Sequence, residues 1–322
     1  MLVSVIVPVY NGESFVLETL RSIQNQTFKD FEVLVMDDGS TDRTKEIVDA
    51  LHEEDNRFNF VALPHQGAPG HARNEGLRQA KGTYLVYFDS DDKMEATMLE
   101  DMLALMDDDT DLVIGNARYY DVVNKCECDN EMSHFFSKEE HTYNDLFTIN
   151  PFPCNKMYRR AFLLNTGVWY LEKVFNQDLG YFLCNVMHRP RFKVQHKVIM
   201  EYHIRPNSIT TSKKTLKRHK DILKVFDQVF EEYEKCDAKD MEYGLYEMFI
   251  KTMIFKVSFF DLLRDQEEIK EIRTYLYTHA PKWYKRKEYL NYYSFKKRIY
   301  NTLLIRMQLY GLIGNYKKLK KG

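Results

Sequence analysis

Short apolar runs alternate with helical patterns along the first 115 residues, and this alternation constrains the fold more than any other feature of the chain. The segments between the runs place apolar residues on one helical face, as Val16, Leu20 and Ile23 do. Runs rich in β-branched and aromatic residues are typical of strands buried on both faces of a sheet. The alternation predicts an α/β fold with a doubly wound, mostly parallel, Rossmann-like sheet. The predicted strands occupy residues 3–9, 31–36, 58–63, 84–88 and 112–115.

Acidic and polar residues follow three of the predicted strands at their carboxyl ends. The first strand continues into Tyr10–Glu13, the second into Asp37–Ser40 and the fourth into Asp89–Asp92. Ligands of a doubly wound sheet bind outside these strand ends. Carboxylates that crowd together repel one another unless a cation or a catalytic task makes use of them. We therefore expect a single functional crevice, in which Arg73 is the only nearby cation.

Charge is distributed unevenly along the chain. Residues 1–115 contain 9 Lys and Arg against 23 Asp and Glu, whereas the remaining residues contain 37 against 25. An anionic ligand in the acidic half would need a bridging cation, and Asp89-Ser90-Asp91 offers two carboxylates that suit Mg²⁺ or Mn²⁺. A solvated acidic turn is the alternative interpretation of this triplet, but the other acidic strand ends favour a metal site.

Four segments resemble the signature of glycosyltransferase family 2, whose members have the GT-A fold. They are VSVIVPVYN at 3–11, MDDGSTD at 36–42, GHARNEGL at 70–77 and YLVYFDSDD at 84–92. The resemblance implies inverting transfer of a sugar from a nucleotide-sugar, usually a UDP-sugar, with Mn²⁺ or Mg²⁺ as cofactor. It also implies three parts of the chain: a nucleotide-sugar-binding part (1–115), an acceptor-binding part (116–212) and a helical C-terminal region (213–322).

The same resemblance implies roles for individual residues. Asp89 and Asp91 match the DxD metal ligands, and His203 is a further candidate ligand whose alternative is a structural role. Asp178 matches the general base, which needs only one carboxylate within reach of the acceptor hydroxyl, and Gln177 stands where the family has Glu. Helix capping is the alternative for Asp178, and neutralisation of the carboxylates is the alternative for Arg73. The implied nucleotide-binding residues are Pro8, Val9, Tyr10, Glu13, Asp38, His65, Arg73 and Ser90.

The C-terminal segment 282–322 is strongly basic. It contains twelve Lys and Arg against one acid, Glu288, and interleaves them with aromatic residues. One interpretation is an interfacial helix on an anionic membrane surface, and the other is a helical bundle with a solvated basic rim. No recognition motif for nucleic acid accompanies the charge.

The sequence also bears on localisation. No apolar run approaches a membrane span, and the N-terminus lacks the basic region of a signal peptide. Five cysteines, an odd number in a long chain, indicate reduced thiols. We therefore expect a cytoplasmic protein, peripheral at the inner face of the plasma membrane if the basic segment contacts lipid.

Together these features predict a metal-dependent inverting glycosyltransferase with Asp178 as general base. Its acceptor would be a glycan or a lipid-linked sugar in cell-surface or exported glycan synthesis. A phosphatase of the haloacid dehalogenase type also uses Asp-x-Asp after a strand, but normally near the N-terminus. A non-catalytic regulatory protein that binds a sugar nucleotide in a GT-A fold is the alternative from another functional class.

Overall fold

The chain divides into two units that are described separately. A computed structural model describes residues 1–129, 132–205, 216–263, 266–301 and 305. The first unit comprises residues 1–140 and 149–214, and the second comprises residues 141–148 and 215–322. The predicted division of the first unit at residue 115 into a donor part and an acceptor part remains a prediction.

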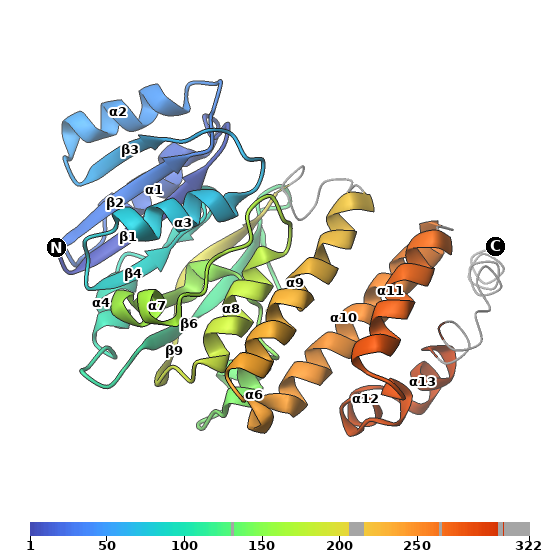
Figure 1. The fold of residues 1–322 in the computed structure, drawn as a ribbon. Helices are drawn as coiled ribbons and strands as arrows, with labels where there is room; N and C mark the ends of the chain where they lie inside the picture. The colour runs from blue at the N-terminus through green and yellow to red at the C-terminus, as the bar shows by residue number, and fades with distance from the viewer. Residues whose placement is uncertain (130–131, 206–215, 264–265, 302–304, 306–322) are drawn as a thin grey trace. The chain divides into compact units, whose positions relative to one another are not determined.

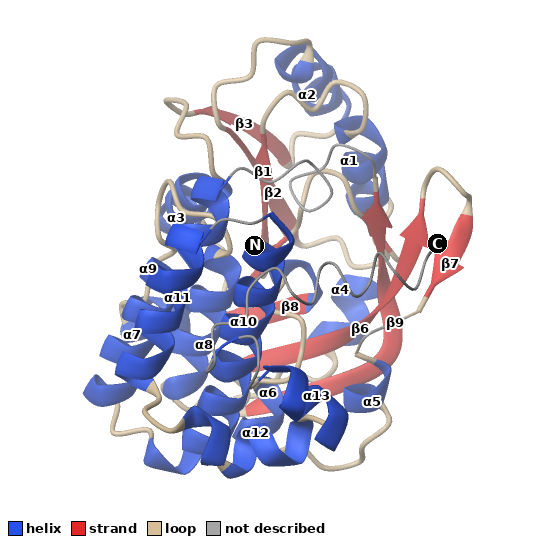
Figure 2. Cartoon of the chain, turned by 90° about the vertical axis from the view of Figure 1, so that its right-hand side faces the viewer, coloured by secondary structure: helices blue, strands red, loops and turns tan. Residues whose placement is uncertain are grey.

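Across its described residues, the first unit is built on a mixed sheet of nine strands. The strands lie in the order β3-β2-β1-β4-β8-β6-β9-β5, and β7 pairs with β6. Figure 2 shows β6 and β9 as long, curved neighbours. The bounds are β1 (Val3–Val9), β2 (Phe31–Asp37), β3 (Phe58–Ala62), β4 (Tyr84–Tyr87), β5 (Lys93–Met94), β6 (Leu112–Asp121), β7 (Cys126–Cys128), β8 (Lys156–Arg159) and β9 (Phe192–Ile204).

The predicted α/β fold is confirmed, and the parallel part of the sheet is the part that the apolar runs predicted. Strands β3, β2, β1 and β4 are parallel, and every residue of β1 is buried. The second half is mixed, because β8 enters antiparallel between β4 and β6, while β6 and β9 are parallel. The antiparallel pairs are β4–β8, β6–β8, β6–β7 and β5–β9.

Helices cover the sheet of the first unit, and their positions follow the sequence pattern closely (Figure 1). The helix that carries Asp178 spans Gln177–Met187. α3 approaches β1 closely, since a Cβ on Gly76 would lie 2.4 Å from Ile6 Cγ2. The helices of this unit are α1 (Val16–Gln24), α2 (Thr44–Glu54), α3 (Pro69–Gln79), α4 (Met98–Leu103), α5 (Ser133–Phe136), η1 (Pro153–Asn155), α7 (Arg160–Thr166) and α8 (Gln177–Met187).

The register of the parallel strands brings three carboxyl ends to one edge of the sheet. Val9 of β1 pairs with Asp37 of β2, and Ile6 of β1 pairs with Tyr87 of β4. Beyond these pairs, the Asp38 amide donates to the Val9 carbonyl at 2.9 Å. The residues that follow β1, β2 and β4 therefore leave the sheet at the same edge, as the strand ends predicted.

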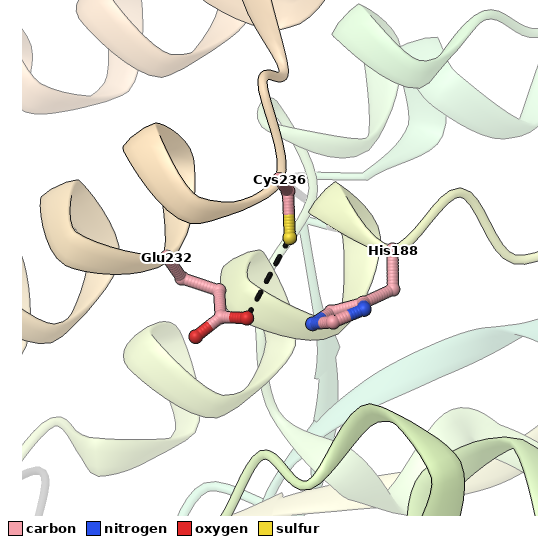
Figure 3. A group of neighbouring side chains, drawn as sticks. All are labelled: His188, Glu232 and Cys236. Carbon is pink, nitrogen blue, oxygen red and sulfur yellow. Dashed lines mark hydrogen bonds between the residues drawn. The ribbon is translucent and has the colours of Figure 1, made fainter.

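The second unit is helical across its described residues. The rings of Phe226, Phe230 and Phe249 pack against one another in its core. Immediately after α9, the Cys236 thiol donates to the Glu232 carboxylate one turn earlier, at 3.5 Å (Figure 3). Its helices are α6 (Tyr143–Leu146), α9 (Leu216–Lys235), η2 (Lys239–Met241), α10 (Glu242–Leu263), α11 (Gln266–His279), η3 (Trp283–Lys285), α12 (Lys287–Tyr292) and α13 (Phe295–Asn301).

The described start of the basic segment packs within the second unit. Trp283 and Tyr289 are buried. Arg286 donates to Glu242 at 2.8 Å and to Glu288 at 2.9 Å, and lies 3.8 Å over the ring of Tyr246. This packing is what the bundle interpretation expects for these residues, while residues 302–304 and 306–322 lie outside the described part of the chain. In the described helices, no segment combines the length and the apolar character needed to cross a membrane.

Candidate active site

The two aspartates after β2 have different partners. Asp37 closes its own turn by accepting the amide and the hydroxyl of Ser40. Asp38 instead accepts the backbone amides of Gln66 at 2.7 Å and Gly67 at 2.9 Å. A tight turn therefore accounts for Asp37 alone, and Asp38 fixes the loop that precedes α3.

An aromatic pair lies beside Asp38. The His65 ring approaches Asp38, with Nδ1 2.7 Å from the carbonyl oxygen and 3.1 Å from Oδ2. The exposed ring of Tyr10 stacks on His65, with 4.4 Å between centroids and 30° between planes. The structure thus brings together three residues predicted to bind the nucleotide. A flat, exposed aromatic surface beside a fixed carboxylate is suited to stacking on a base and accepting its hydrogen bonds.

The other predicted nucleotide-binding residues take part in the backbone around this edge. Pro8 and Val9 are buried in β1. The Ser90 carbonyl accepts the hydroxyl of Thr19 at 2.8 Å. Glu13 is turned toward α2, where its carboxylate accepts the Arg43 amide at 3.1 Å. Nucleotide contacts by these four residues remain predictions.

Arg73 joins the end of β4 to the first turn of α8. Its guanidinium donates to Asp89 at 2.6 Å and to Asp178, yet the side chain is only 2% exposed. It lies 5.3 Å over the ring of Tyr170. Burial disfavours the charge on Arg73, but the two carboxylates outweigh this effect and raise the pKa of the guanidinium. Arg73 therefore neutralises carboxylates that the sequence assigned to two different roles.

Asp178 points across the site instead of capping its own helix. α8 begins at Gln177, its N-cap is Asn176, and the Asp178 carboxylate pairs with Arg73. Burial raises the pKa of Asp178, Arg73 opposes the shift, and the nearby charge of Asp89 adds to it. A carboxylate with raised proton affinity that faces a crevice is suited to general base catalysis.

A second arginine neutralises Asp91. Arg205, at the end of β9, forms an ion pair with Asp91 and lies 4.0 Å over the ring of Phe15. The prediction that Arg73 is the only cation near the crevice is wrong. Arg205 is 114 positions from Asp91 in the sequence, so only the fold brings the pair together.

A buried group next to the DxD pair was also missed from the sequence. Ligand atoms of Asp89, Asp92 and Cys154 lie within 4.8 Å of one another, and the Asp89 amide donates to Cys154 Sγ at 3.3 Å. Burial and the charge of Asp89 raise the pKa of Asp92 well above its ordinary value. Asp92 also accepts the backbone amide of His203 at 2.9 Å. Asp92 thus ties the end of β4 to β9.

The carboxylates of Asp89 and Asp91 fit the divalent cation that the sequence implies. Their side chains are 28% and 29% exposed, and each has one arginine partner. Oxygen donors of this kind suit Mg²⁺ or Mn²⁺. His203 Nε2 lies 3.4 Å from Glu201 Oε2. Metal ligation by His203 remains a prediction.

Lys156 is an unexpected buried cation beneath the site. Its ammonium donates to the Phe152 carbonyl at 2.7 Å, Asn155 Oδ1 at 2.8 Å and the Asn150 carbonyl at 3.2 Å. Burial lowers the pKa of Lys156 to about 7, while the charges of Cys154 and Asp178 oppose the shift. Three acceptors match the three N–H bonds of an ammonium. Lys156 therefore fixes the turn that carries Cys154 to Asp89.

Comparison with known proteins decides the family. The family model described as Glycosyl transferase family 2 matches residues 4–166. The chain belongs to glycosyl transferase family 2. This family of glycosyltransferases is the one that the four segments indicated, and it leaves no support for a phosphatase of the haloacid dehalogenase type.

Relatives and solved structures agree with the family. The chain is 35% identical over 165 residues to the putative glycosyltransferase EpsH of Bacillus subtilis strain 168, across 50% of this chain and 48% of EpsH. Several curated relatives are matched over about half of their own length or less. A crystal structure of S. aureus TarS 1–349 in complex with UDP-GlcNAc has a TM-score of 0.74 and 24% identity, covering 88% of this chain and 83% of that one.

A more distant structure shares the fold. The mannosyltransferase PcManGT from Pyrobaculum calidifontis, in complex with GDP-Man and Mn²⁺, has a TM-score of 0.56 and 16% identity, covering 94% of this chain and 86% of that one. Together with the family match, these structures confirm the predicted GT-A fold with its helical C-terminal region.

We predict that Lys156→Met removes part of the pH dependence of stability. Because the pKa of Lys156 is lower in the folded protein, about 7, than its ordinary 10.5, the unfolded chain binds more protons between these values. The free energy of unfolding of the natural protein should therefore rise between pH 7 and 9, by about 2 kcal/mol relative to Lys156→Met. Urea unfolding at several pH values measures this difference. Parallel curves for the two proteins would contradict it.

Proposed function

We propose that this protein is an inverting glycosyltransferase that moves a sugar from a UDP-sugar to an acceptor hydroxyl. The observation that carries the proposal is the ion-pair bridge Asp89–Arg73–Asp178. It holds the DxD carboxylate of Asp89 and the candidate base together, at the edge of the sheet where the Tyr10–His65 aromatic pair also lies. The TarS structure with UDP-GlcNAc supports a UDP-sugar as donor.

Asp178 performs the proton transfer in this mechanism. Its carboxylate takes the proton of the acceptor hydroxyl as the oxygen attacks the anomeric carbon on the face opposite the nucleotide. The bond from the anomeric carbon to the diphosphate oxygen breaks in the same displacement, so the configuration inverts. Arg73 holds Asp178 ionised and oriented before the acceptor arrives.

Asp89 and Asp91 would hold Mn²⁺ or Mg²⁺, with His203 as the third candidate ligand. Such a cation supplies positive charge that stabilises a departing diphosphate. The crevice is otherwise acidic, and Arg73 and Arg205 are both engaged by carboxylates. Binding of a diphosphate here thus needs additional positive charge, which favours metal dependence. The structure of PcManGT with Mn²⁺ supports the same choice.

The acceptor in this proposal is a glycan or a lipid-linked sugar, and the pathway is synthesis of a cell-surface or exported glycan. A relative at 36% identity over 114 residues is GalNAc(5)-diNAcBac-PP-undecaprenol beta-1,3-glucosyltransferase of Campylobacter jejuni. A non-catalytic protein that binds a sugar nucleotide is the alternative. Metal-dependent hydrolysis of a UDP-sugar would exclude it, and tight nucleotide binding without hydrolysis or transfer would favour it.

Asp178→Asn should retain donor binding and lose transfer. The amide keeps the size of the side chain but cannot take a proton, and loss of a general base typically costs about 10²–10⁴-fold in rate. Asp108→Asn, at an exposed acid, is the matched control. Turnover with the acceptor and calorimetric titration with UDP give the two readouts. Near-normal turnover of Asp178→Asn would remove Asp178 from the role of base.

Asp91→Ala should abolish the part of UDP affinity that depends on Mn²⁺. The substitution removes a carboxylate from the exposed strand end and leaves the buried strands untouched, so the protein should fold. Titration of UDP with and without Mn²⁺ tests this, with Asp108→Ala as the control. Unchanged metal-dependent affinity in Asp91→Ala would contradict the metal assignment.

We also propose that the protein is cytoplasmic and associates with the inner face of the plasma membrane through residues 282–322. All five cysteines are free thiols. Within the described part of the segment, Trp283 and Tyr289 are buried, whereas Leu290, Tyr292 and several lysines are exposed. The exposed lysines are Lys282, Lys285, Lys287, Lys296 and Lys297.

Replacing these five lysines with glutamine should weaken binding to anionic liposomes, because each lysine near an anionic surface contributes about 1 kcal/mol. Raised salt should release the natural protein, and neutral liposomes should not bind it. Co-sedimentation measures this. The control replaces an equal number of exposed lysines elsewhere, at Lys29, Lys45, Lys81, Lys125 and Lys173. Binding that is indifferent to lipid charge would refute the membrane contact.

A further inference from the structure

The first turn of α8 packs against α3 with no space for a side chain at Gly70. A Cβ at Gly70 would lie 2.0 Å from Gln177 Oε1 and 2.6 Å from the carbonyl oxygen of Leu171. Gln177 is buried, and its Oε1 has no hydrogen-bond partner in the described residues. Because the carbonyl end of this amide gains no hydrogen bond, the side chain contributes to this contact through its shape.

The same face of α3 binds the rest of the segment that leads to α8. Residues 70, 73 and 74 are neighbours on the surface of a helix. Asn74 Oδ1 accepts the Tyr170 amide at 3.0 Å, and Asn74 Nδ2 donates to the Tyr170 carbonyl at 3.0 Å. Arg73 pairs with Asp178 at the other end. The face thus contacts residues 170–178 at their beginning and at their end.

Between these two contacts the backbone adopts a conformation that its residues disfavour. Lys173 and Asn176 have φ of 59° and 60°, in the left-handed region that residues other than glycine disfavour, lysine more than asparagine. Strained residues persist where the surroundings determine the conformation. The contacts that Gly70, Arg73 and Asn74 make from α3 are the surroundings that hold Lys173 and Asn176 in this conformation.

We infer that Gln177 and Gly70 are positioning residues for the general base. Gln177 fills the space over Gly70, fixes the start of α8, and so directs the adjacent Asp178 toward Arg73. The inference assigns a role to the glutamine that stands where the family has Glu, and it rests on the proposed role of Asp178. It also gives the GHARN segment a second task, which is to hold the chain that carries the base.

Two substitutions at Gln177 separate shape from hydrogen bonding. Gln177→Ala should lower kcat for sugar transfer from the UDP-sugar by about 10- to 100-fold. A small displacement of a catalytic group has effects of this size. The dissociation constant for UDP should stay within about twofold. Gln177→Met keeps the length of the side chain and removes the unpartnered oxygen, so it should recover most of the kcat that Gln177→Ala loses.

A matched pair of glycine substitutions on α3 tests the other partner. In Gly70→Ala the added methyl group would clash with Gln177, so kcat should fall while the affinity for UDP is retained. Gly76→Ala pushes against Ile6 in the core, at 2.4 Å. It should lower the melting temperature and leave kcat of the folded protein unchanged. Circular dichroism and UDP titration on every variant establish that the protein is folded.

The outcomes distinguish this inference from the proposed function. If the natural protein transfers sugar but Gln177→Ala keeps its kcat, the positioning role is wrong and the function stands. If Gln177→Met loses as much kcat as Gln177→Ala in folded protein, the amide itself is needed and the inference is overturned. A natural protein that binds UDP without transfer or hydrolysis contradicts the proposed function instead.

Discussion

The buried guanidinium of Arg73 is the interaction on which the candidate site depends. Its two carboxylate partners come from elements far apart in the sequence, Asp89 after β4 and Asp178 on α8. Burying an arginine costs free energy unless its charge is compensated, and removing one partner from such a bridge leaves a charge without compensation. The position of α3 on β1, the end of β4 and the start of α8 are therefore linked through one side chain.

The Arg73 bridge is part of a wider balance between acidic and basic side chains at this edge of the sheet. Six acidic residues lie at or just after the ends of β1, β2 and β4, and Arg73 and Arg205 pair with two of them, Asp89 and Asp91. Lys156, whose own pKa is lowered to about 7 by burial, opposes the rise in the pKa of Asp178 when it is protonated. In the proposed function, the remaining negative charge attracts the divalent cation that a diphosphate needs. Donor binding and orientation of the base would then depend on one balanced set of charges.

Much of the first half of the fold follows from sequence pattern, because local forces determine it. Apolar runs predicted β1 to β4, and helical periodicity predicted α1. The acids at the strand ends indicated the crevice because parallel strands place their carboxyl ends at one edge. The antiparallel entry of β8 was not predictable, since it depends on pairing with β6, which no local pattern encodes.

The partners of the site residues could not be predicted either, because they lie far away in the sequence and no local pattern encodes the contact. Arg205 reaches Asp91, and Cys154 reaches Asp89, across long stretches of chain. Lys156 was overlooked because lysine is rarely buried, and the backbone acceptors that permit it are visible only in the folded chain. The fit of Gln177 against Gly70, where a Cβ would lie 2.0 Å from Gln177 Oε1, depends on how two helices pack, which the sequence pattern does not encode.

A crystal structure with UDP and Mn²⁺ tests the central claim most directly, namely that donor and base meet at the Arg73 bridge. The account predicts the base of the nucleotide against Tyr10 and His65, the ion on the DxD carboxylates, and Asp178 still paired with Arg73. A nucleotide bound away from the carboxyl ends of β1, β2 and β4, or an Asp178 turned away from Arg73 toward solvent, would contradict it.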